Sequence, residues 1–294
     1  MQFSIIIPVY NSHTTIERCL LGVQNLKHPS FEVFLVDSSP DDRSSEIIKR
    51  FPQYRLMKSK RRLLMHAARN LAIQHASGST IVCLDPDCVP EEDWLTRLED
   101  SLGKGFSVVG GGIAFSPSSS MNLAAHIVKF SLWFPGDETR LVADLPTANL
   151  AIRRKALDAV GGFSEDYIAG DTELCHRLRR HGYENFFDGR AVVHHIHEVT
   201  FRSLGRERFK RGIDFGVMRA ATQEWNTMLS LLTIVGMPLL ALRQFYWKFK
   251  ASASHGYLTG FLRMAPVILC CDFAWMTGVA IGKARSLVRP RSPA

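Results

Sequence analysis

The sequence predicts an α/β domain with a mostly parallel central sheet, followed by an α-helical tail that is apolar and basic. In the first half of the chain, apolar β-branched runs alternate with segments of helical periodicity, which is the order of parallel sheets covered by helices. After Glu224 the chain is largely apolar and carries eight basic residues against one acid, Asp272. The net charge of +8 therefore belongs almost entirely to the tail. We expect two domains, at residues 1–222 and 223–294.

Length and composition exclude several classes of protein. A chain of 294 residues, 46% of them hydrophobic, can bury a substantial core, and it is not a disordered chain, a collagen or a small disulfide scaffold. The six cysteines show no CxxC pair and no zinc spacing, which favours buried thiols in a reducing compartment. No basic region or small-residue cleavage site precedes the first strand, so we expect the front of the chain to face the cytoplasm.

The first 84 residues are expected to form seven elements that alternate strand and helix. Continuous β-branched runs are typical of strands buried on both faces, and an apolar stripe at helical spacing marks each helix. Gly78 stands just beyond the third helix, where glycine commonly ends a helix. The expected strands are Phe3–Val9, Phe31–Val36, Tyr54–Lys58 and Thr80–Leu84, and the expected helices are Thr14–Leu26, Ser44–Phe51 and Arg62–His75.

The second half of the chain is less regular. Gly110, Gly111 and Gly112 interrupt an apolar run, which indicates a bulged strand near a ligand. Gly161 and Gly162 mark the end of a short helix. We expect strands at Phe106–Phe115, Asn149–Arg153 and Ala191–His195, and helices at Lys155–Val160, Asp171–His181 and Thr200–Thr222.

The segment Asp85-Pro86-Asp87-Cys88 follows a buried strand directly. Ligands of parallel sheets bind beyond the carboxyl ends of the strands, and two carboxylates one residue apart can reach one site there. Hard divalent cations prefer such oxygen ligands, and phosphates can complete the coordination. The alternative is a solvated turn, because aspartate and proline favour turns.

Four further side chains are candidates, and each has an ordinary structural alternative. Asp37, at the end of another strand, could hydrogen-bond a ribose or a base edge, or belong to a helix-capping loop. Arg69 could pair with a phosphate or lie on a helix surface. Asp171 could take part in chemistry or cap the helix that follows it. His195 could bind a metal or pack as an ordinary core or surface residue.

In their order and spacing, these residues resemble the inverting family-two glycosyltransferases with the GT-A fold. The opening strand and nucleotide loop, the nucleoside-binding turn, the Arg-Asn pair, the DxD metal motif, the stretch before the acceptor site and the helix of the catalytic base all have counterparts. The resemblance covers about residues 3–215. The corresponding segments are Ser4–Asn11, Val36–Asp41, Ala68–Asn70, Asp85–Asp87 with Pro90 and Trp94–Leu95, Asn149 and Arg153 with Gly161–Phe163, and Asp171–Tyr183.

The resemblance implies a reaction and a set of roles. A sugar would pass from a nucleotide-sugar donor to a hydroxyl of a glycan or lipid-linked acceptor, and Mn²⁺ or Mg²⁺ would neutralise the departing nucleoside diphosphate. Asp171 would be the general base that deprotonates the acceptor hydroxyl. The donor-binding residues would be Pro8, Tyr10, Asp37, Arg69 and Asp85, and the metal ligands would be Asp87 and His195, with His197 as the alternative to His195.

Two departures from the family pattern bear on the site. Gly170 stands where the family often has a glutamate before the catalytic aspartate. It leaves open an alternative function, a non-catalytic protein of the same fold that binds nucleotide sugars or acts as a scaffold. Leu64 and Ala72 stand where glycine is common around the Arg-Asn pair, and they bear on the geometry of the donor loop.

Two apolar segments in the tail indicate membrane association. A spanning helix needs about 20 mostly apolar residues. Trp225–Leu242 reaches that length only with the aromatic cluster Phe245–Trp247, and Gly256–Gly282 only by burying Asp272. We expect a membrane hairpin or a pair of interfacial helices, with amphipathic or core helices as the alternative. The excess charge lies among these apolar residues, so we expect membrane lipids as partners and no nucleic acid.

Overall fold

The computed structural model of the protein describes residues 2–222 and 227–288. Their contacts divide into two compact units. The first, the sheet unit, takes in residues 2–116, 135–166 and 170–196, and the second, the helical unit, contains the other described residues. The division expected at residue 222 falls inside the helical unit, because the segments 120–130 and 201–222 pack on the last helix of the chain.

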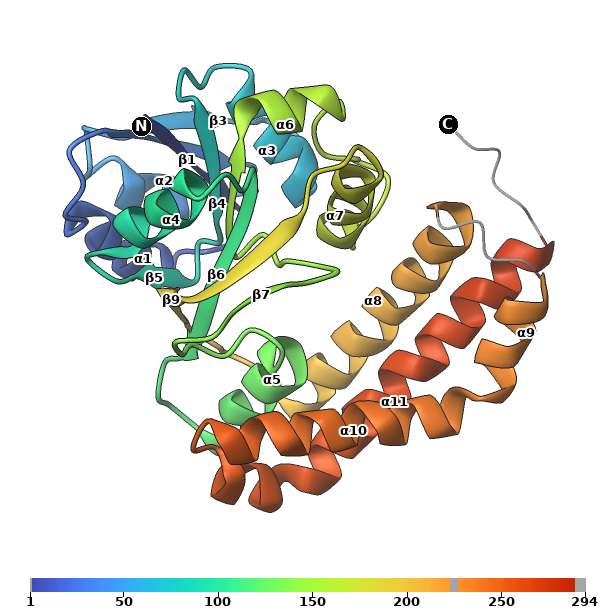
Figure 1. Ribbon diagram of the computed structural model, residues 1–294. Helices are drawn as coiled ribbons and strands as arrows, with labels where there is room; N and C mark the ends of the chain where they lie inside the picture. Colours follow the sequence, from blue (N-terminus) through green and yellow to red (C-terminus); the bar gives the residue numbers. More distant parts are fainter. Residues whose placement is uncertain (1, 223–226, 289–294) are drawn as a thin grey trace. The chain divides into compact units, whose positions relative to one another are not determined.

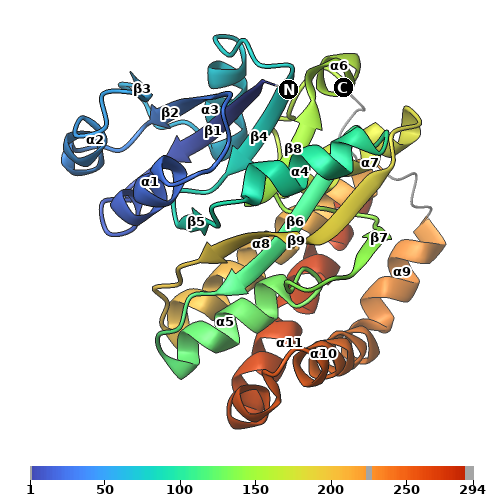
Figure 2. The same ribbon diagram turned by 60° about the vertical axis from the view of Figure 1, so that its left-hand side comes forward.

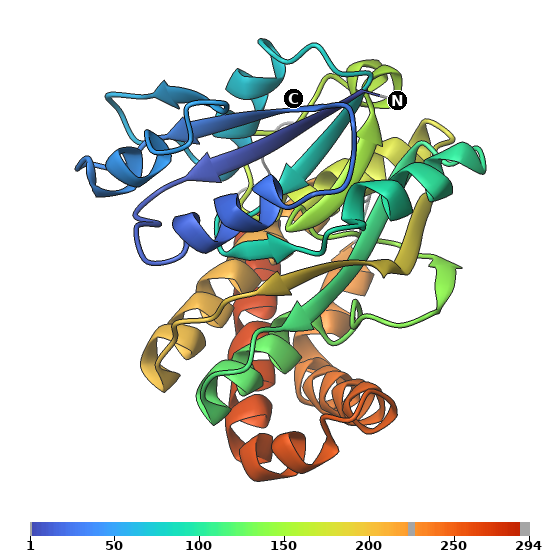
Figure 3. The same ribbon diagram turned by 90° about the vertical axis from the view of Figure 1, so that its left-hand side faces the viewer.

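Four parallel strands form one half of the sheet, in the order β3-β2-β1-β4. They are β1 (Phe3–Val9), β2 (Phe31–Asp37), β3 (Arg55–Lys58) and β4 (Thr80–Leu84), close to the predicted ranges. Every residue of β1 and β4 is buried, as expected for strands covered on both faces. Figure 3 shows the arrowheads of β1 and β2 pointing the same way, toward one edge of the sheet.

The other half of the sheet is mixed. β8 (Asn149–Arg153) runs antiparallel to β4, and the order continues through β6 (Val108–Phe115), β9 (Asn185–His195) and β5 (Cys88–Pro90), while β7 (Thr139–Leu141) pairs with β9. β9 begins at Asn185 rather than at Ala191, because a shift of register opposite Gly111 and Gly112 accommodates an irregular stretch that interrupts the apolar pattern. The predicted strand at the three glycines is present, but the bulge lies on its partner: Gly110–Gly112 run without interruption in β6, and the extra residues, 189–191, belong to β9.

Helices of the sheet unit cover both faces of the sheet. The crossovers between parallel strands place α1 (Ile16–Gln24) and α2 (Arg43–Ile48) on one face and α3 (Met65–Ile73) on the other, as Figure 2 shows. The remaining helices are α4 (Trp94–Gly103), which contacts β6 and β9, α6 (Arg154–Ala159) and α7 (Gly170–Arg180). The pattern of the sequence did not indicate α4.

The helical unit contains five helices among its described residues. They are α5 (Ser120–Phe130), α8 (Phe201–Thr222), α9 (Thr227–Val235), α10 (Met237–Ser254) and α11 (Leu258–Val288). α8 and α11 lie side by side along their length, and α10 packs on α11 (Figure 1). An apolar core that includes Ala124, Leu204 and Phe261 joins α5, α8 and α11.

The first predicted tail segment is not one straight helix. α9 and α10 meet at a bend of 70°, because Gly236 separates them and Pro238, in the first turn of α10, has no amide hydrogen with which to continue α9. Trp225 and Asn226, at the start of the predicted segment, lie outside the described residues.

The second predicted segment forms α11, which is long and apolar enough over residues 258–287 to cross a membrane. α9 and α10 pass the same test only as a bent pair. Asp272, the one acid of this segment, has a fully buried side chain, and Lys248 Nζ on α10 donates a hydrogen bond to its Oδ1 over 2.8 Å.

Candidate active site

Asp85 and Asp87 lie in the turn between β4 and β5, beyond the carboxyl end of β4. The amide of Cys88 donates to the carbonyl of Asp85 at 3.0 Å, and the amide of Ile196 donates to the carbonyl of Asp87 at 2.7 Å. These backbone bonds fix the turn, and the carboxylates keep exposed surface: 25% of the Asp85 side chain and 36% of the Asp87 side chain.

One group of ligand atoms beside this turn suits a metal ion. Single ligand atoms of Asp87, Cys88 and His195 all lie within 4.8 Å of one another, because Cys88 on β5 is paired directly with His195 on β9. His195 Nε2 lies 3.5 Å from Asp87 Oδ1. Carboxylate oxygen and imidazole nitrogen fit Mn²⁺ or Mg²⁺ better than the soft thiol does, so Asp87 and His195 are the matching donors.

The alternative metal ligand, His197, belongs to the helical unit. Its side chain is 3% exposed, and its Nε2 lies 3.2 Å from Nδ1 of His126 on α5. Aromatic rings, including that of Phe130, surround this histidine pair. The structure therefore groups His195 with Asp87 and places His197 in an aromatic core.

Arg69 is bound to Asp85. Its side chain is fully buried on α3, and Nη2 donates to Asp85 Oδ1 over 2.6 Å. A buried guanidinium needs such a counter-charge, because an unpaired charge is costly away from water. In this structure Arg69 therefore orients one of the two carboxylates of the turn, and its contact with phosphate stays a prediction.

The neighbouring residue, Asn70, holds the chain that leads to α7. Its Nδ2 donates to the carbonyl of Phe163 at 2.9 Å, and its Oδ1 accepts from the amide of Phe163 at 3.0 Å. Gly161 and Gly162 precede that residue with φ near +75° and +79°, a region that favours glycine. The Arg-Asn pair thus fastens two segments, the turn after β4 and the loop before α7.

Asp37 ends β2 and is fully buried. The amide of Ser39 donates to it at 2.8 Å, Lys58 Nζ donates at 3.0 Å, and the Ser45 hydroxyl donates as well. Burial disfavours its charge, but these hydrogen bonds outweigh burial and hold the pKa of Asp37 below its usual value. The carboxylate is ionised and shapes the turn after β2. Its contact with a nucleoside stays a prediction.

Pro8 and Tyr10 lie at the end of β1, beside that turn. Pro8 is buried within the strand and paired with Val36, whereas the Tyr10 side chain is 38% exposed. The guanidinium of Arg62 stands over the Tyr10 ring at 4.4 Å from its centroid. Tyr10 therefore offers an exposed aromatic ring at the carboxyl edge of the sheet.

Asp171 lies in the first turn of α7 and is partly buried. Its Oδ1 accepts from the amide of Thr172 at 2.9 Å. α7 is fastened at its other side by Arg177, which binds both carboxylate oxygens of Glu173 and the carbonyls of Val160 and Gly162. Asp171 is thus a carboxylate on the first turn of a well-anchored helix.

The pattern of the sequence missed His66 and Lys58. Lys58 neutralises Asp37, and the hydrogen bonds that it donates raise its own pKa against the effect of desolvation. His66 is 1% exposed, and its ring fills the space that a side chain at position 170 would occupy. The unusual Gly170 was the available signal, because a missing side chain leaves room for another residue.

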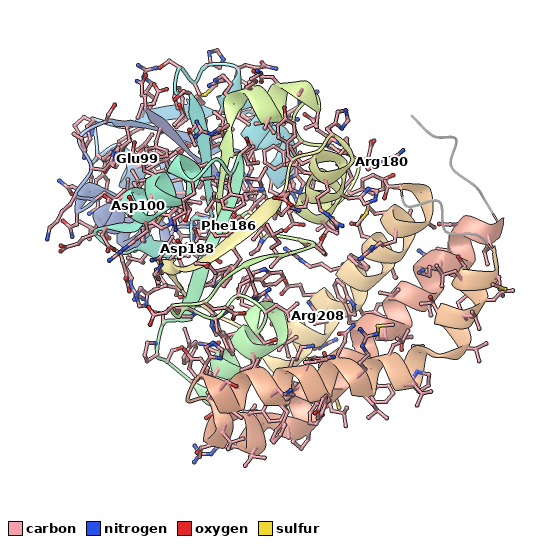
Figure 4. The ribbon with its side chains drawn as sticks, viewed as in Figure 1. Glu99, Asp100, Arg180, Phe186, Asp188 and Arg208 are labelled. Atoms are coloured by element: carbon pink, nitrogen blue, oxygen red, sulfur yellow. The ribbon has the colours of Figure 1, made fainter. Side chains whose placement is uncertain are left out.

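A second buried carboxylate belongs to the framework. Asp188 on β9 accepts from the Ser101 hydroxyl of α4 at 2.7 Å and pairs with Arg190 at 2.7 Å. Figure 4 labels it on β9 beside Phe186. Burial opposes its charge, but the hydrogen bonds from Arg190 and Ser101 keep the pKa of Asp188 below its usual value.

Comparison with known proteins places the chain among glycosyltransferases. The family model described as glycosyl transferase family 2 matches residues 4–161. The glycosyltransferase AglE of Haloferax volcanii is 28% identical over 96% of this chain and 88% of its own length. An undecaprenyl-phosphate 4-deoxy-4-formamido-L-arabinose transferase of Pectobacterium carotovorum is 30% identical over 80% of this chain and 64% of its own length.

A solved structure shows the same fold. The mannosyltransferase PcManGT from Pyrobaculum calidifontis, solved in complex with GDP-Man and Mn²⁺, superposes with a TM-score of 0.65. The alignment covers 96% of this chain and 87% of that one, at 19% identity. The predicted GT-A fold is confirmed by this likeness and by the family model.

Proposed function

Because the chain belongs to glycosyl transferase family 2, we propose that it is a metal-dependent, inverting glycosyltransferase with a lipid-linked or polysaccharide acceptor. The nucleotide-sugar donor follows from the family. The observation that carries the rest is the turn after β4, where Asp85 is bound to Arg69 and Asp87 lies beside His195. These partly exposed carboxylates stand at the carboxyl edge of the sheet, where ligands of such folds bind.

On the donor side, Tyr10 and the turn ordered by Asp37 receive the nucleoside, with Pro8 fixing the end of β1. Asp85, held by Arg69, accepts hydrogen bonds from the ribose, because an ionised carboxylate is an acceptor only. Arg69 is buried behind Asp85 in this structure, so its effect on the pyrophosphate passes through the field of its charge and through Asp85.

Asp87 and His195 are the residues that would hold the divalent cation. When bound, Mn²⁺ or Mg²⁺ neutralises the negative charge that grows on the departing nucleoside diphosphate. The mannosyltransferase PcManGT was solved with Mn²⁺. That structure supports, by analogy, the choice of Mn²⁺ for this chain.

Asp171 is the general base. Its carboxylate accepts the proton of the acceptor hydroxyl while the hydroxyl oxygen attacks the anomeric carbon. The bond from that carbon to the nucleoside diphosphate breaks, and the electron pair leaves with the phosphate oxygen. One displacement on the face opposite the leaving group inverts the anomeric centre.

The helical unit provides the contact with membrane lipids, and the sheet unit, which carries the proposed site, faces the cytoplasm. Exposed apolar side chains on α9, α10 and α11 support this assignment, among them Leu232, Val235, Leu239, Trp247 and Leu262. One relative is named for undecaprenyl phosphate, a lipid carrier, which supports a lipid-linked acceptor for this chain.

A donor screen tests the proposal. The detergent-solubilised protein is incubated with UDP-, GDP- and dTDP-sugars, with and without Mn²⁺, and nucleoside diphosphate release is measured. We expect release from one donor that depends on the metal. Asp171→Asn should lower turnover at least about a hundredfold, as loss of general-base catalysis does, while GDP or UDP binding with Mn²⁺ is unchanged.

Asp158→Asn is the matched control, because Asp158 is an exposed residue on α6 away from the turn after β4. It should leave turnover unchanged. Full turnover in Asp171→Asn would contradict the assignment of the base, and release without any metal would contradict metal dependence.

A further inference from the structure

His66 lies between the two halves of the proposed site, and the inference about it rests on the proposed function. Its ring, on α3, stacks on Phe163 with centroids 5.4 Å apart and planes 13° from parallel. With 1% exposure the side chain is inside the sheet unit. On one side it meets Arg69, which binds Asp85, and on the other it meets Gly170, which precedes Asp171.

The contact with Arg69 fixes the tautomer of His66. Its Nδ1 lies 3.4 Å from Arg69 Nη1. A guanidinium has donors and no acceptor, so Nδ1 accepts this hydrogen bond and carries no proton. The imidazole proton is then on Nε2. His66 thus steadies the same guanidinium whose Nη2 holds Asp85 at 2.6 Å.

The contact with Gly170 is steric. A Cβ at position 170 would lie 2.6 Å from Cδ2 and 2.7 Å from Nε2 of His66, well inside van der Waals contact. Withdrawal of the ring is hindered on two sides, because Phe163 stacks on one face and Arg69 lies beside Nδ1. A side chain at position 170 would therefore push the first turn of α7, and Asp171 with it.

We propose that His66 is a positioning residue that keeps the general base Asp171 and the donor-binding carboxylate of Asp85 in fixed positions relative to each other. Through Arg69 it orients Asp85, and through its fit against Gly170 it sets the place of Asp171. Gly170 is then the residue that leaves room for the ring of His66, and its small size does not mean that a functional group has been lost. Two sets of variants separate the two contacts.

The first set is an exchange of size between positions 66 and 170. Turnover is measured with UDP-glucose and GDP-mannose in Mn²⁺, together with thermal unfolding. In the wild-type background we expect Gly170→Ala to lower kcat about tenfold or more, since small misplacements of a reacting group are costly. In the His66→Ala background the same change should cost less than about twofold, because the ring is gone.

The second set separates the ring from its nitrogen. His66→Phe keeps the stack on Phe163 but removes the acceptor for Arg69, whereas His66→Asn places an amide oxygen near the position of Nδ1. We expect His66→Phe to raise the donor KM about fivefold with a smaller change in kcat, and His66→Asn to restore most of the donor KM. Gly170→Ala should act chiefly on kcat.

Three outcomes would overturn the proposal: an equal effect of Gly170→Ala in both backgrounds, no split between KM and kcat, or melting temperatures that fall while the kinetics of the folded protein are unchanged. If the wild-type protein turns over neither donor, the proposed function fails for those donors. The proposal is then decided by the affinity for UDP and GDP in Mn²⁺: His66→Phe should weaken it about fivefold and His66→Asn should restore most of it, whereas equal affinities would overturn the proposal.

Discussion

The carboxylates of the sheet unit differ in how much surface they expose. Asp37 and Asp188 expose none, and each is compensated by a cation and hydroxyl donors. Asp85 and Asp87 keep a quarter and about a third of their side chains exposed. Full compensation suits a carboxylate that shapes the backbone, whereas exposed oxygen atoms remain able to bind a ligand. This contrast separates the framework acids from those we assign to the reaction.

Replacing Asp87 should weaken the metal requirement in a measurable way. Asp87→Asn removes a charged oxygen from the pair formed with His195, so the Mn²⁺ concentration for half-maximal turnover should rise about tenfold or more. The matched control is Asp93→Asn, just before α4, which should leave the metal requirement unchanged. Equal metal dependence in Asp87→Asn and the wild type would contradict the ligand assignment.

Asp188 should make the stability of the protein depend on pH in the acid range. Its folded pKa lies below the usual value, so the unfolded chain binds its proton first as the pH falls. The stabilisation is complete above the unfolded pKa and is lost as the pH falls through the folded pKa. Asp188→Asn should cost about 2 kcal/mol at neutral pH, where Arg190 loses its partner, and progressively less as the pH falls below the unfolded pKa of Asp188.

The measurement is urea unfolding of the two proteins at several pH values. A difference between wild type and Asp188→Asn that is constant from neutral to acid pH would contradict the role of ionisation.

His66 illustrates the limit of prediction from the sequence at the scale of single residues. Asp85 and Asp87 stand one residue apart after a strand and can be recognised from the pattern, whereas the contact of His66 with Gly170 joins residues far apart in the sequence.

At the scale of elements, the sequence pattern predicted the alternating half of the sheet closely and the rest less well. β1 and β4 are continuous apolar runs, and such runs are typical of strands that are covered by helices on both faces of a sheet. α4 and α5 were missed and β9 was found only in part, because a bulge opposite Gly111 and Gly112 breaks the periodicity on which recognition depends.

The contact between α8 and α11 depends on glycines. A Cβ at Gly216 would lie 2.4 Å from the carbonyl oxygen of Val279, and one at Gly282 would lie 2.2 Å from that of Ile213. Gly282→Ala should therefore force the helices apart and cost about 1–3 kcal/mol of stability. Thermal unfolding in detergent measures the loss.

Gly205, also on α8, is the matched control, since a Cβ there meets nothing within 4 Å. Gly205→Ala should stabilise the protein by about 0.5–1 kcal/mol, because alanine loses less conformational freedom than glycine in a helix. Equal effects at the two positions would show that α8 and α11 are not packed as closely as described.

For the whole molecule, the distribution of charge carries more information than its total. The excess of basic residues belongs to the tail, and there it stands among apolar side chains. The structure adds that Lys248 is paired with Asp272. Among the described residues of the tail, the exposed basic side chains are those of Arg243, Lys250, Arg263 and Arg285. The domain boundary was the least predictable feature, because α8 reads as part of the polar front by composition but packs on α11.

This distribution predicts how the protein binds to vesicles. Val235 and Leu239 are 80% and 72% exposed on α9 and α10, and burial of such side chains in lipid contributes roughly 1.5–3 kcal/mol each. The double substitution Val235→Glu/Leu239→Glu should therefore lower the partition into phosphatidylcholine vesicles more than about tenfold. The exposed Leu141 of β7, in the sheet unit, is the matched control site, and Leu141→Glu should leave partition unchanged.

Adding anionic lipid to the vesicles should strengthen binding in a salt-dependent way, because the basic side chains of the tail then meet opposite charge. Since the apolar contribution does not depend on salt screening, part of the binding should persist at 1 M salt. Complete release at high salt, or an equal loss in Leu141→Glu, would mean that the apolar faces of α9 and α10 do not enter the lipid.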